Sequence, residues 1–419
     1  MSNTSLKEKA GKAIQKFSDI KFVKCMSAAV TAGMGATIAG SIFMILQNPP
    51  FPADMTGGFI DAWRAWASAN SSWLGLGYQV TIEFLGLYAL IGMIMAVSDI
   101  NKIRPVNMLI VGICTYLLLA VNLVEGQLDI RFMGSKGLIT ALIVGYLVVE
   151  SAQWLMKHGF KLKLPDAVPP FVAEPLNALF VNIIILAAAV AIRLITAAFT
   201  GGQLLPNTIN MLFAPLFVAS DSLFGVILYV LFLRLLWFFG IHGGSVANAV
   251  MSPILSVAMT ANSEAFMQDQ PLPYIFNSSF VAIWTQMGIL TLALTLVIAA
   301  KSKQLKAISK VSLVPAFFNI GEPLTFGVPI VMNFRILVPY LLVFVLNGVV
   351  PYIATSIGLI NRTFVNLPYT VPSVVKAFLG GMDIRSVILY LILVVADILI
   401  YLPWIKRYDK ELTARENEA

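Results

Sequence analysis

The sequence predicts an all-α polytopic membrane protein with about ten transmembrane helices, two re-entrant hairpins and a horizontal amphipathic helix. Apolar residues make up 58% of its 419 residues and charged residues only 12%, whereas about a quarter of a soluble domain is charged. The mean hydropathy is +0.85. The apolar residues gather in runs of about 20, the length that an α-helix needs to cross a bilayer.

The charged residues favour a defined orientation in the membrane. The net charge of +7 comes from 28 Lys and Arg against 21 Asp and Glu, and the basic residues cluster between apolar runs and at both ends. This positive-inside pattern predicts cytoplasmic termini and argues against a nucleic-acid partner. The lysine-rich arm before Cys25 leads into a long apolar run without a small-residue cleavage site, so we expect an uncleaved first span.

The apolar runs are interrupted by polar or proline-rich loops. In chain order, the predicted spans are Met26–Leu46, Leu74–Val97, Val106–Val124, Leu138–Met156, Ala178–Ile195, Leu223–Phe239, Tyr274–Ala299, Leu337–Ile357 and Val387–Tyr401. Residues 125–136 are polar and are expected outside. Residues 200–222 combine glycines and prolines with scattered apolar residues, which indicates a helix along the membrane surface.

A first break follows the sixth span, where the chain reads W-F-F-G-I-H-G-G from Trp237 to Gly244. Three glycines in five residues disfavour a continuous helix, by about 1 kcal/mol each relative to alanine. His242 lies among them, and an imidazole at membrane depth is costly unless it faces water, protein or ligand. Residues 243–262 are small and semi-polar, which predicts a re-entrant hairpin there.

A second break lies between Phe317 and Met332, with Glu322 between Gly321 and Pro323 in an apolar segment. It predicts the other hairpin, at about 313–333. Transporters place substrates at such broken helices. We therefore expect a scaffold half in residues 1–200, with about five transmembrane helices, and a substrate-transport half in residues 201–419.

An imidazole and a carboxylate in one cavity could do either of two jobs. They could hydrogen-bond sugar hydroxyls, with one of them accepting a proton from a hydroxyl under attack. They could instead form a proton relay. Each also has an ordinary structural interpretation, a backbone-bonded histidine for His242 and a salt-bridged or protonated packing residue for Glu322. Trp237 and Tyr369 could stack on a sugar face or serve as packing and interfacial residues.

Several stretches resemble a known family. W-F-F-G-I-H-G at 237–243 and F-N-I-G-E-P-L-T-F-G-V-P-I-V-M-N at 318–333 are similar to signature stretches of the enzyme IIC permeases of the phosphoenolpyruvate-dependent sugar phosphotransferase system. The match is to the lactose/cellobiose/diacetylchitobiose group. Shorter stretches at 34–43, 168–172 and 401–404 extend the resemblance over nearly the whole chain.

The resemblance implies a homodimer in a bacterial cell membrane, with the N-terminal half at the dimer interface. It implies that a β-linked disaccharide is carried inward, by an elevator-type movement, and that a phosphocysteine of a IIB protein phosphorylates its 6-hydroxyl. The chain would then act as an enzyme only together with phosphorylated IIB, which IIA recharges. The motif positions map to His242 and Glu322 as catalytic candidates, and the substrate-binding candidates are Trp237, His242, Gly243, Asn319, Glu322 and Tyr369.

The chain departs from the family pattern at three positions. Gly321 replaces an asparagine, Tyr369 replaces a tryptophan and Phe334 replaces a proline, which leaves the class unchanged but the sugar open. Neither Cys25 nor Cys114 opens a phosphate-binding loop, so IIA and IIB are expected as separate chains. No metal or cofactor is expected. The competing interpretation is a proton-coupled secondary sugar transporter with His242 and Glu322 as its relay.

Overall fold

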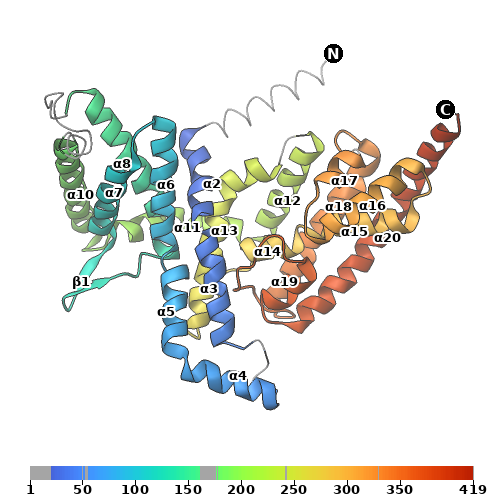
Figure 1. Cartoon of the computed structure of the whole chain (residues 1–419), viewed down its shortest axis with the longest axis horizontal. Helices are drawn as coiled ribbons and strands as arrows, with labels where there is room; N and C mark the ends of the chain where they lie inside the picture. The colour runs from blue at the N-terminus through green and yellow to red at the C-terminus, as the bar shows by residue number, and fades with distance from the viewer. Residues whose placement is uncertain are drawn as a thin grey trace. The chain divides into compact units, whose positions relative to one another are not determined.

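Long apolar helices dominate the chain (Figure 1). The computed structural model describes residues 20–49, 51, 55–160, 176, 178–240, 243–328 and 330–418. Within these residues, 7 helices are long and apolar enough to cross a membrane, or up to 8 if one bent pair counts as a single span. The predicted helical, multi-pass membrane class is confirmed, whereas the count of ten spans remains a prediction.

The helices pack into two compact units. One unit comprises Met1–Gly40, Leu76–Leu216 and Ala249–Thr260, and the other comprises Ser41–Gly75, Phe217–Asn248 and Ala261–Ala419. Four of the described helices contribute residues to both units, namely α3 (Met34–Gln47), α5 (Ser71–Ile82), α11 (Leu205–Ser220) and α13 (Gly243–Met267). The predicted scaffold and substrate halves are defined by function and do not correspond to these two packing units. They remain a prediction.

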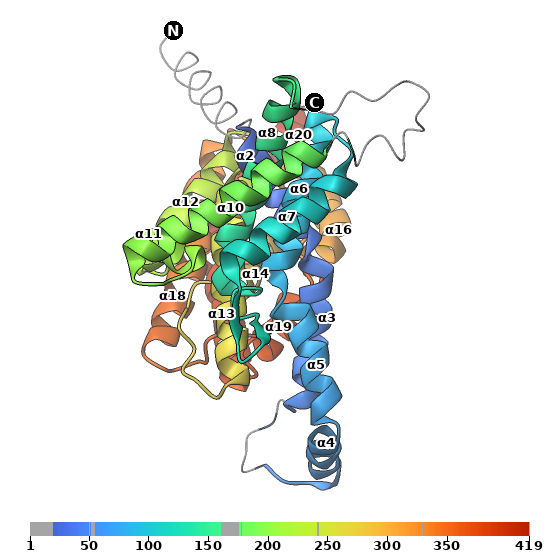
Figure 2. The same cartoon turned by 90° about the vertical axis from the view of Figure 1, so that its left-hand side faces the viewer.

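The first unit is a bundle around α6, which packs against α2, α7 and α8, while α10 packs against α7 and α8 (Figures 1 and 2). Its elements are α2 (Lys21–Ala32), α3 (Met34–Gln47), α5 (Ser71–Ile82), α6 (Leu85–Asn101), α7 (Pro105–Ala120), β1 (Asn122–Val124), β2 (Gln127–Asp129), the 3-10 helix η1 (Ser135–Gly137), α8 (Leu138–Lys157), α10 (Leu179–Thr200) and α11 (Leu205–Ser220). Small residues bring the backbones together, since a Cβ at Gly92 would lie 2.7 Å from the Ala29 carbonyl oxygen.

The third apolar run ends earlier than predicted. α7 stops at Ala120 because Arg193 of α10 donates to the Leu118 and Val121 carbonyl oxygens, at 2.5 and 2.7 Å, and so satisfies its last carbonyls. Residues 122–129 then form an antiparallel hairpin whose turn, Glu125–Gly126, has positive φ at both positions. The predicted span Val106–Val124 is therefore wrong at its end, and the fold is not purely helical.

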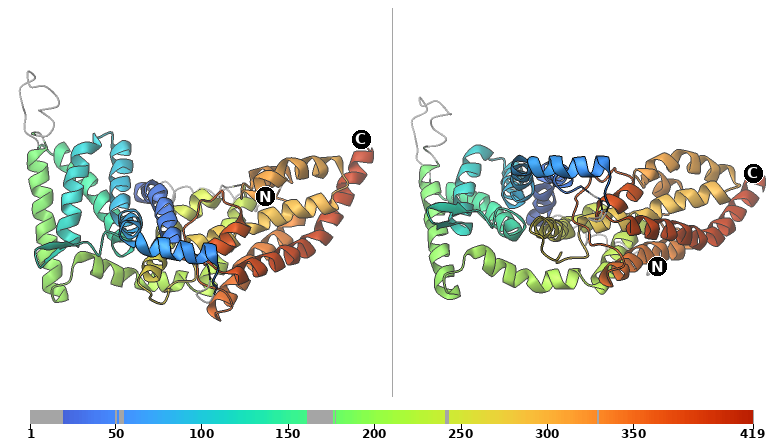
Figure 3. Two further views of the ribbon diagram at one scale, coloured as in Figure 1. Left: turned by 60° about the horizontal axis from the view of Figure 1, so that its bottom comes forward. Right: turned by 90° about the horizontal axis from the view of Figure 1, so that it is seen from below.

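The second unit is built on α15, which packs against α16, α18 and α20, while α12 packs on α18 (Figure 3). Its helices are α4 (Gly58–Ala69), α12 (Leu223–Phe238), α14 (Ser278–Trp284), α15 (Met287–Ala299), α16 (Lys303–Phe317), α17 (Glu322–Gly327), α18 (Phe334–Ser356), α19 (Ser373–Leu379) and α20 (Ile384–Glu418). Asp397 of α20 joins three of them at one buried point, since it accepts from Thr291 of α15 and Asn347 of α18, at 3.0 and 2.8 Å.

The hairpin predicted within residues 243–262 is wrong, because Gly243–Met267 form one continuous helix, α13. Its glycines lie in the first turn, whose N–H groups have no intrahelical partner in any helix. Pro253 inside the helix removes one more N–H group without ending it. At 313–333, in contrast, the predicted break is present, and α16 and α17 on its two sides pack against each other.

The segment before the sixth span is also helical. α11 makes an angle of 77° with α12, so the two do not continue one another. The Ser222 side chain accepts from the Gly225 N–H at 3.0 Å and caps the start of α12. The position of α11 along a membrane surface remains a prediction.

Candidate functional site

The second broken element is shaped by Asn319. Its φ of 65° is left-handed, a conformation that asparagine tolerates better than most residues. The Asn319 N–H donates to the Ala316 carbonyl at 3.0 Å, and the Ile320 N–H donates to the Pro315 carbonyl at 2.9 Å. This pair of hydrogen bonds is a Schellman motif, so asparagine ends α16 where glycine commonly stands.

The side chain of the same asparagine holds the irregular segment that carries Tyr369. Asn319 Nδ2 donates to the carbonyl oxygens of Tyr369 and Val371, at 2.9 and 3.0 Å, and its Oδ1 accepts from the Ser373 hydroxyl at 2.6 Å. The Tyr369 hydroxyl returns a hydrogen bond to the Asn319 carbonyl at 2.7 Å. Both N–H groups of the amide are thus occupied within the protein.

Glu322 is the first residue of α17, and its side chain is exposed. Pro323 takes the next position, where its missing N–H costs no hydrogen bond. Gly321 packs against α15, because a Cβ there would lie 2.7 Å from Ile289 Cδ1. An asparagine at 321 would collide with Ile289 unless that side chain moved. Glycine, rather than the family's asparagine, therefore fits beside Ile289.

Charges of opposite sign act on Tyr369. Burial raises the pKa of its hydroxyl, the positive charge of Arg234 lowers that pKa, and the negative charge of Glu322 raises it. Glu322 therefore lies within electrostatic reach of Tyr369, another of the predicted substrate-binding residues.

The two signature stretches touch each other. The Met332 N–H, at the end of the second stretch, donates to the Phe238 carbonyl at 2.9 Å. Trp237 lies in the last turn of α12, half-buried, and a Cβ at Gly243 would lie 2.9 Å from its Cδ1 atom. Only glycine allows α13 to begin this close to the indole ring. Segments about 80 residues apart in the sequence, at 237–243 and 318–333, thus share one region of the second unit.

His242 lies outside the described residues. The remaining predicted site residues form two groups, Trp237 with Gly243 and Asn319 with Tyr369, and Glu322 is coupled to the second group by charge. The arrangement offers aromatic surface and an exposed carboxylate, which suit a polyhydroxylated ligand with apolar faces.

Comparison with known proteins identifies the family. The family described as "Phosphotransferase system, EIIC" matches residues 27–343. The chain belongs to this EIIC family. The resemblance of its motifs is confirmed.

Relatives of this EIIC protein match along nearly its whole length. It is 29% identical to the lichenan permease IIC component of Bacillus subtilis (strain 168), over 99% of this chain and 95% of the relative. It is 30% identical to the cellobiose-specific EIIC component of Geobacillus stearothermophilus, over 96% and 93%. The crystal structure of the transporter ChbC, the IIC component of the N,N'-diacetylchitobiose-specific system, matches with a TM-score of 0.89 and 29% identity, over 98% of this chain and 99% of that one.

The sequence interpretation of this EIIC protein missed two buried cations beside the site. Arg234 of α12 donates to the Thr285 carbonyl at 2.5 Å and to Gln286 Oε1 at 3.2 Å, and its guanidinium lies 3.6 Å from the centroid of the Phe344 ring. It caps α14 at the break before α15. Lys376 of α19 is fully buried. A single basic residue within an apolar run was the available signal for Arg234.

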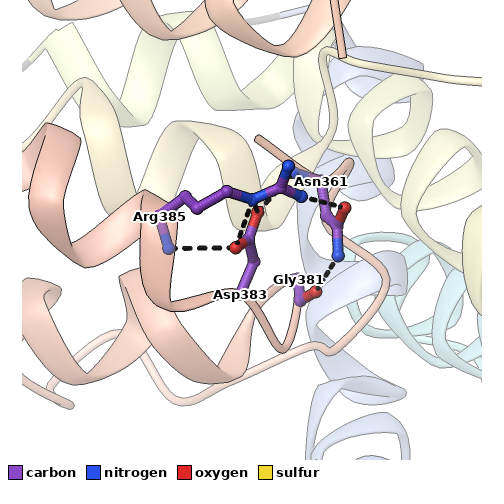
Figure 4. Close-up of polar contacts among 4 residues, drawn as sticks. All are labelled: Asn361, Gly381, Asp383 and Arg385. Atoms are coloured by element: carbon purple, nitrogen blue, oxygen red, sulfur yellow. Dashed lines mark hydrogen bonds and ion pairs between the residues drawn. The ribbon is translucent and has the colours of Figure 1, made fainter. Parts of the chain in front are cut away.

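A polar cluster fixes another end of the EIIC second unit, around the start of α20 (Figure 4). Asp383 accepts from the Asn361 N–H at 2.8 Å and from Arg385 Nε at 2.9 Å, and Arg385 Nη2 donates to Asn361 Oδ1 at 3.0 Å. Asn361 also lines a cavity of about 380 Å³ with Phe266, Arg362 and Phe364. Burial alone would raise the pKa of Asp383, but the hydrogen bonds from Arg385 and Asn361 outweigh it and hold that pKa below its ordinary value.

We expect Asp383→Asn to loosen residues 361–383 at neutral pH. A hydrogen bond to a charged group contributes about 1.5–3 kcal/mol, so amide exchange in this segment should accelerate about tenfold or more. Because the folded pKa is depressed, the stabilisation is present above about pH 4 and is lost as the pH falls through the folded value. Wild type and variant should therefore converge in acid.

Asp129→Asn is the matched control, since Asp129 pairs with Arg131 through the same Asp-x-Arg arrangement in the exposed β hairpin. Unchanged exchange at 361–383 in Asp383→Asn would contradict the assignment, whereas the control should leave that segment as in wild type.

Proposed function

We propose that this chain is the permease of a β-linked disaccharide, of the cellobiose, diacetylchitobiose or lactose kind. The observation that carries the proposal is the contact between the two signature stretches, through the Met332 N–H and the Phe238 carbonyl. It gathers aromatic, carboxylate and amide groups in one region of the second unit. The names of the cellobiose-specific and diacetylchitobiose-specific relatives support the substrate class.

The proposed reaction couples inward movement to phosphorylation. The chain binds the disaccharide outside, carries it inward and presents its 6-hydroxyl to the phosphocysteine of a IIB partner. The hydroxyl oxygen attacks phosphorus, the cysteine sulfur leaves, and the hydroxyl proton passes to His242 or Glu322 as general base. Relatives named lactose-specific EIICB components, such as that of Streptococcus mutans, support a IIB partner, and this chain covers 73% of that relative.

The membrane arrangement belongs to the same proposal. Both termini are cytoplasmic in a bacterial cell membrane, about ten segments cross, and the α16–α17 pair re-enters from one side while α11 lies along the surface. The N-terminal half forms a homodimer, and the substrate half moves against it as an elevator. The basic residues at both ends and the break at 318–321 support this topology.

We expect sealed vesicles containing the protein to accumulate cellobiose or diacetylchitobiose only as the 6-phosphate, and only when phosphorylated IIB is inside. Unphosphorylated IIB is the control, and a proton ionophore should change nothing. Free sugar inside, with uptake that needs no IIB and collapses with the ionophore, would refute group translocation and favour the proton-coupled transporter.

A further inference from the structure

Lys376 is a buried cation that forms no ion pair with any carboxylate of the described residues. Its side chain is fully buried in the second unit. Burying an ammonium group away from water without a counter-charge is unfavourable and costs free energy. Burial accordingly lowers the pKa of Lys376 to about 8. Because burial of this ammonium group is unfavourable, its contacts are expected to show what the group does in the protein.

Both described polar contacts of Lys376 are with one residue. Nζ donates to the Tyr369 carbonyl at 3.1 Å and lies 5.5 Å from the centroid of the Tyr369 ring. The same carbonyl accepts from Asn319 Nδ2, and the Tyr369 hydroxyl donates to the Asn319 carbonyl. Tyr369 is thus held at its carbonyl, its ring and its hydroxyl.

These contacts matter because packing alone does not fix the orientation of the Tyr369 ring. Tyr369 is 49% exposed, and it lies in an irregular stretch between α18 and α19. An exposed tyrosine in such a stretch would normally sample several rotamers, and ordering it on ligand binding would cost affinity. The ammonium group near the ring and the two hydrogen bonds order the Tyr369 side chain before the ligand binds.

We propose that Lys376 is a positioning residue, whose ammonium group holds the Tyr369 ring in the orientation that stacks on the sugar. The inference rests on the proposed function, because it assumes that Tyr369 contacts the disaccharide. Lys376 is too deeply buried to touch the ligand, so it acts through Tyr369.

The surroundings of Lys376 contain few other groups that titrate. α19 packs on α14, which carries no titratable side chain, and on α20. The α20 side contributes Arg385, neutralised by Asp383, and the buried Tyr390 and Asp397. Glu322 and Arg234 act on Tyr369. Among these described groups, Lys376 is the cation that contacts Tyr369, and its pKa of about 8 lies between pH 7 and 9.5.

The test is the affinity of the purified, full-length protein for cellobiose and diacetylchitobiose as a function of pH. The lowered pKa means that Lys376 is charged at pH 7 and loses its proton as the pH rises through about 8. We expect the wild-type affinity to fall about three- to tenfold between pH 7 and 9.5. Lys376→Met should bind about tenfold more weakly at pH 7 and show no pH dependence. Lys376→Arg, which keeps its charge, should bind with a flat profile near the pH 7 wild-type affinity.

Lys310→Met, on the exposed face of α16, is the control and should behave as wild type. A flat wild-type profile, or unchanged binding by Lys376→Met, would overturn the inference. Amide exchange at 366–372 without sugar, corrected for intrinsic pH dependence, gives a second readout that does not depend on Lys376→Met folding. Exchange that rises with pH in wild type but not in Lys376→Arg supports the hold on Tyr369. If exchange rises with pH in this way but no disaccharide binds, the proposed substrate is refuted, whereas the role of Lys376 in positioning Tyr369 is supported.

Discussion

Glu322→Gln is expected to weaken disaccharide binding about 10- to 100-fold in detergent, with no ion gradient present. A hydrogen bond to a charged group is worth about 1.5–3 kcal/mol, and each 1.4 kcal/mol is a tenfold change in affinity. The glutamine keeps the length and shape of the side chain but loses the charge that acts on the Tyr369 region. Calorimetric titration with cellobiose and diacetylchitobiose measures the effect directly.

The matched control is Asp269→Asn, another exposed carboxylate of the second unit, just after α13. It should bind as tightly as wild type. Unaltered binding by Glu322→Gln would remove Glu322 from the sugar contacts. A role for the Glu322 carboxylate in a proton relay would then be favoured over sugar binding. The vesicle experiment tests that role separately.

His242→Ala is expected to lower phosphoryl transfer from phosphorylated IIB about 100- to 10,000-fold, the usual effect of losing a general base. Sugar binding should persist within about tenfold, because one hydrogen bond to a neutral group contributes about 1 kcal/mol. Rapid-quench measurement of sugar phosphate at saturating disaccharide separates the two effects.

His158→Ala provides the control, since the chain has 2 histidines and His158 is exposed at the end of α8, bonded to the Trp154 carbonyl at 2.7 Å. It should leave both transfer and binding intact. If His242→Ala transfers phosphate at the wild-type rate, Glu322 would remain as the candidate base.

Much of the fold follows from local composition. The lengths and positions of the apolar runs predicted α8, α12 and α18 within a few residues, because hydropathy along a helix is a property of the segment itself. A break between Phe317 and Met332 was predicted from the glycines and prolines of that stretch, since these residues act on their own backbone. The structure places the break at 318–321, where Asn319 ends α16. The equally glycine-rich start of α13 gave no hairpin, because glycines in a first turn do not stop a helix that continues beyond them.

Other features depend on partners far along the chain. α7 ends where it does because of Arg193, more than 70 residues later. The amide of Asn319, available to a ligand as judged from the sequence, is occupied by Tyr369, Val371 and Ser373. Neither pairing has a local signal in the sequence.

The sequence by itself determined that this protein is a multi-pass membrane protein of the EIIC family, where its apolar helices lie and where the second site element breaks. Those properties depend on neighbouring residues, whose burial and backbone preferences add up within one segment. Only the tertiary structure decided that the two signature stretches meet at Met332 and Phe238, and that Asn319 and Lys376 both hold Tyr369. Hydrogen bonds between distant segments exist only once packing has brought the donors to the acceptors, and buried polar groups in apolar surroundings must then find those partners.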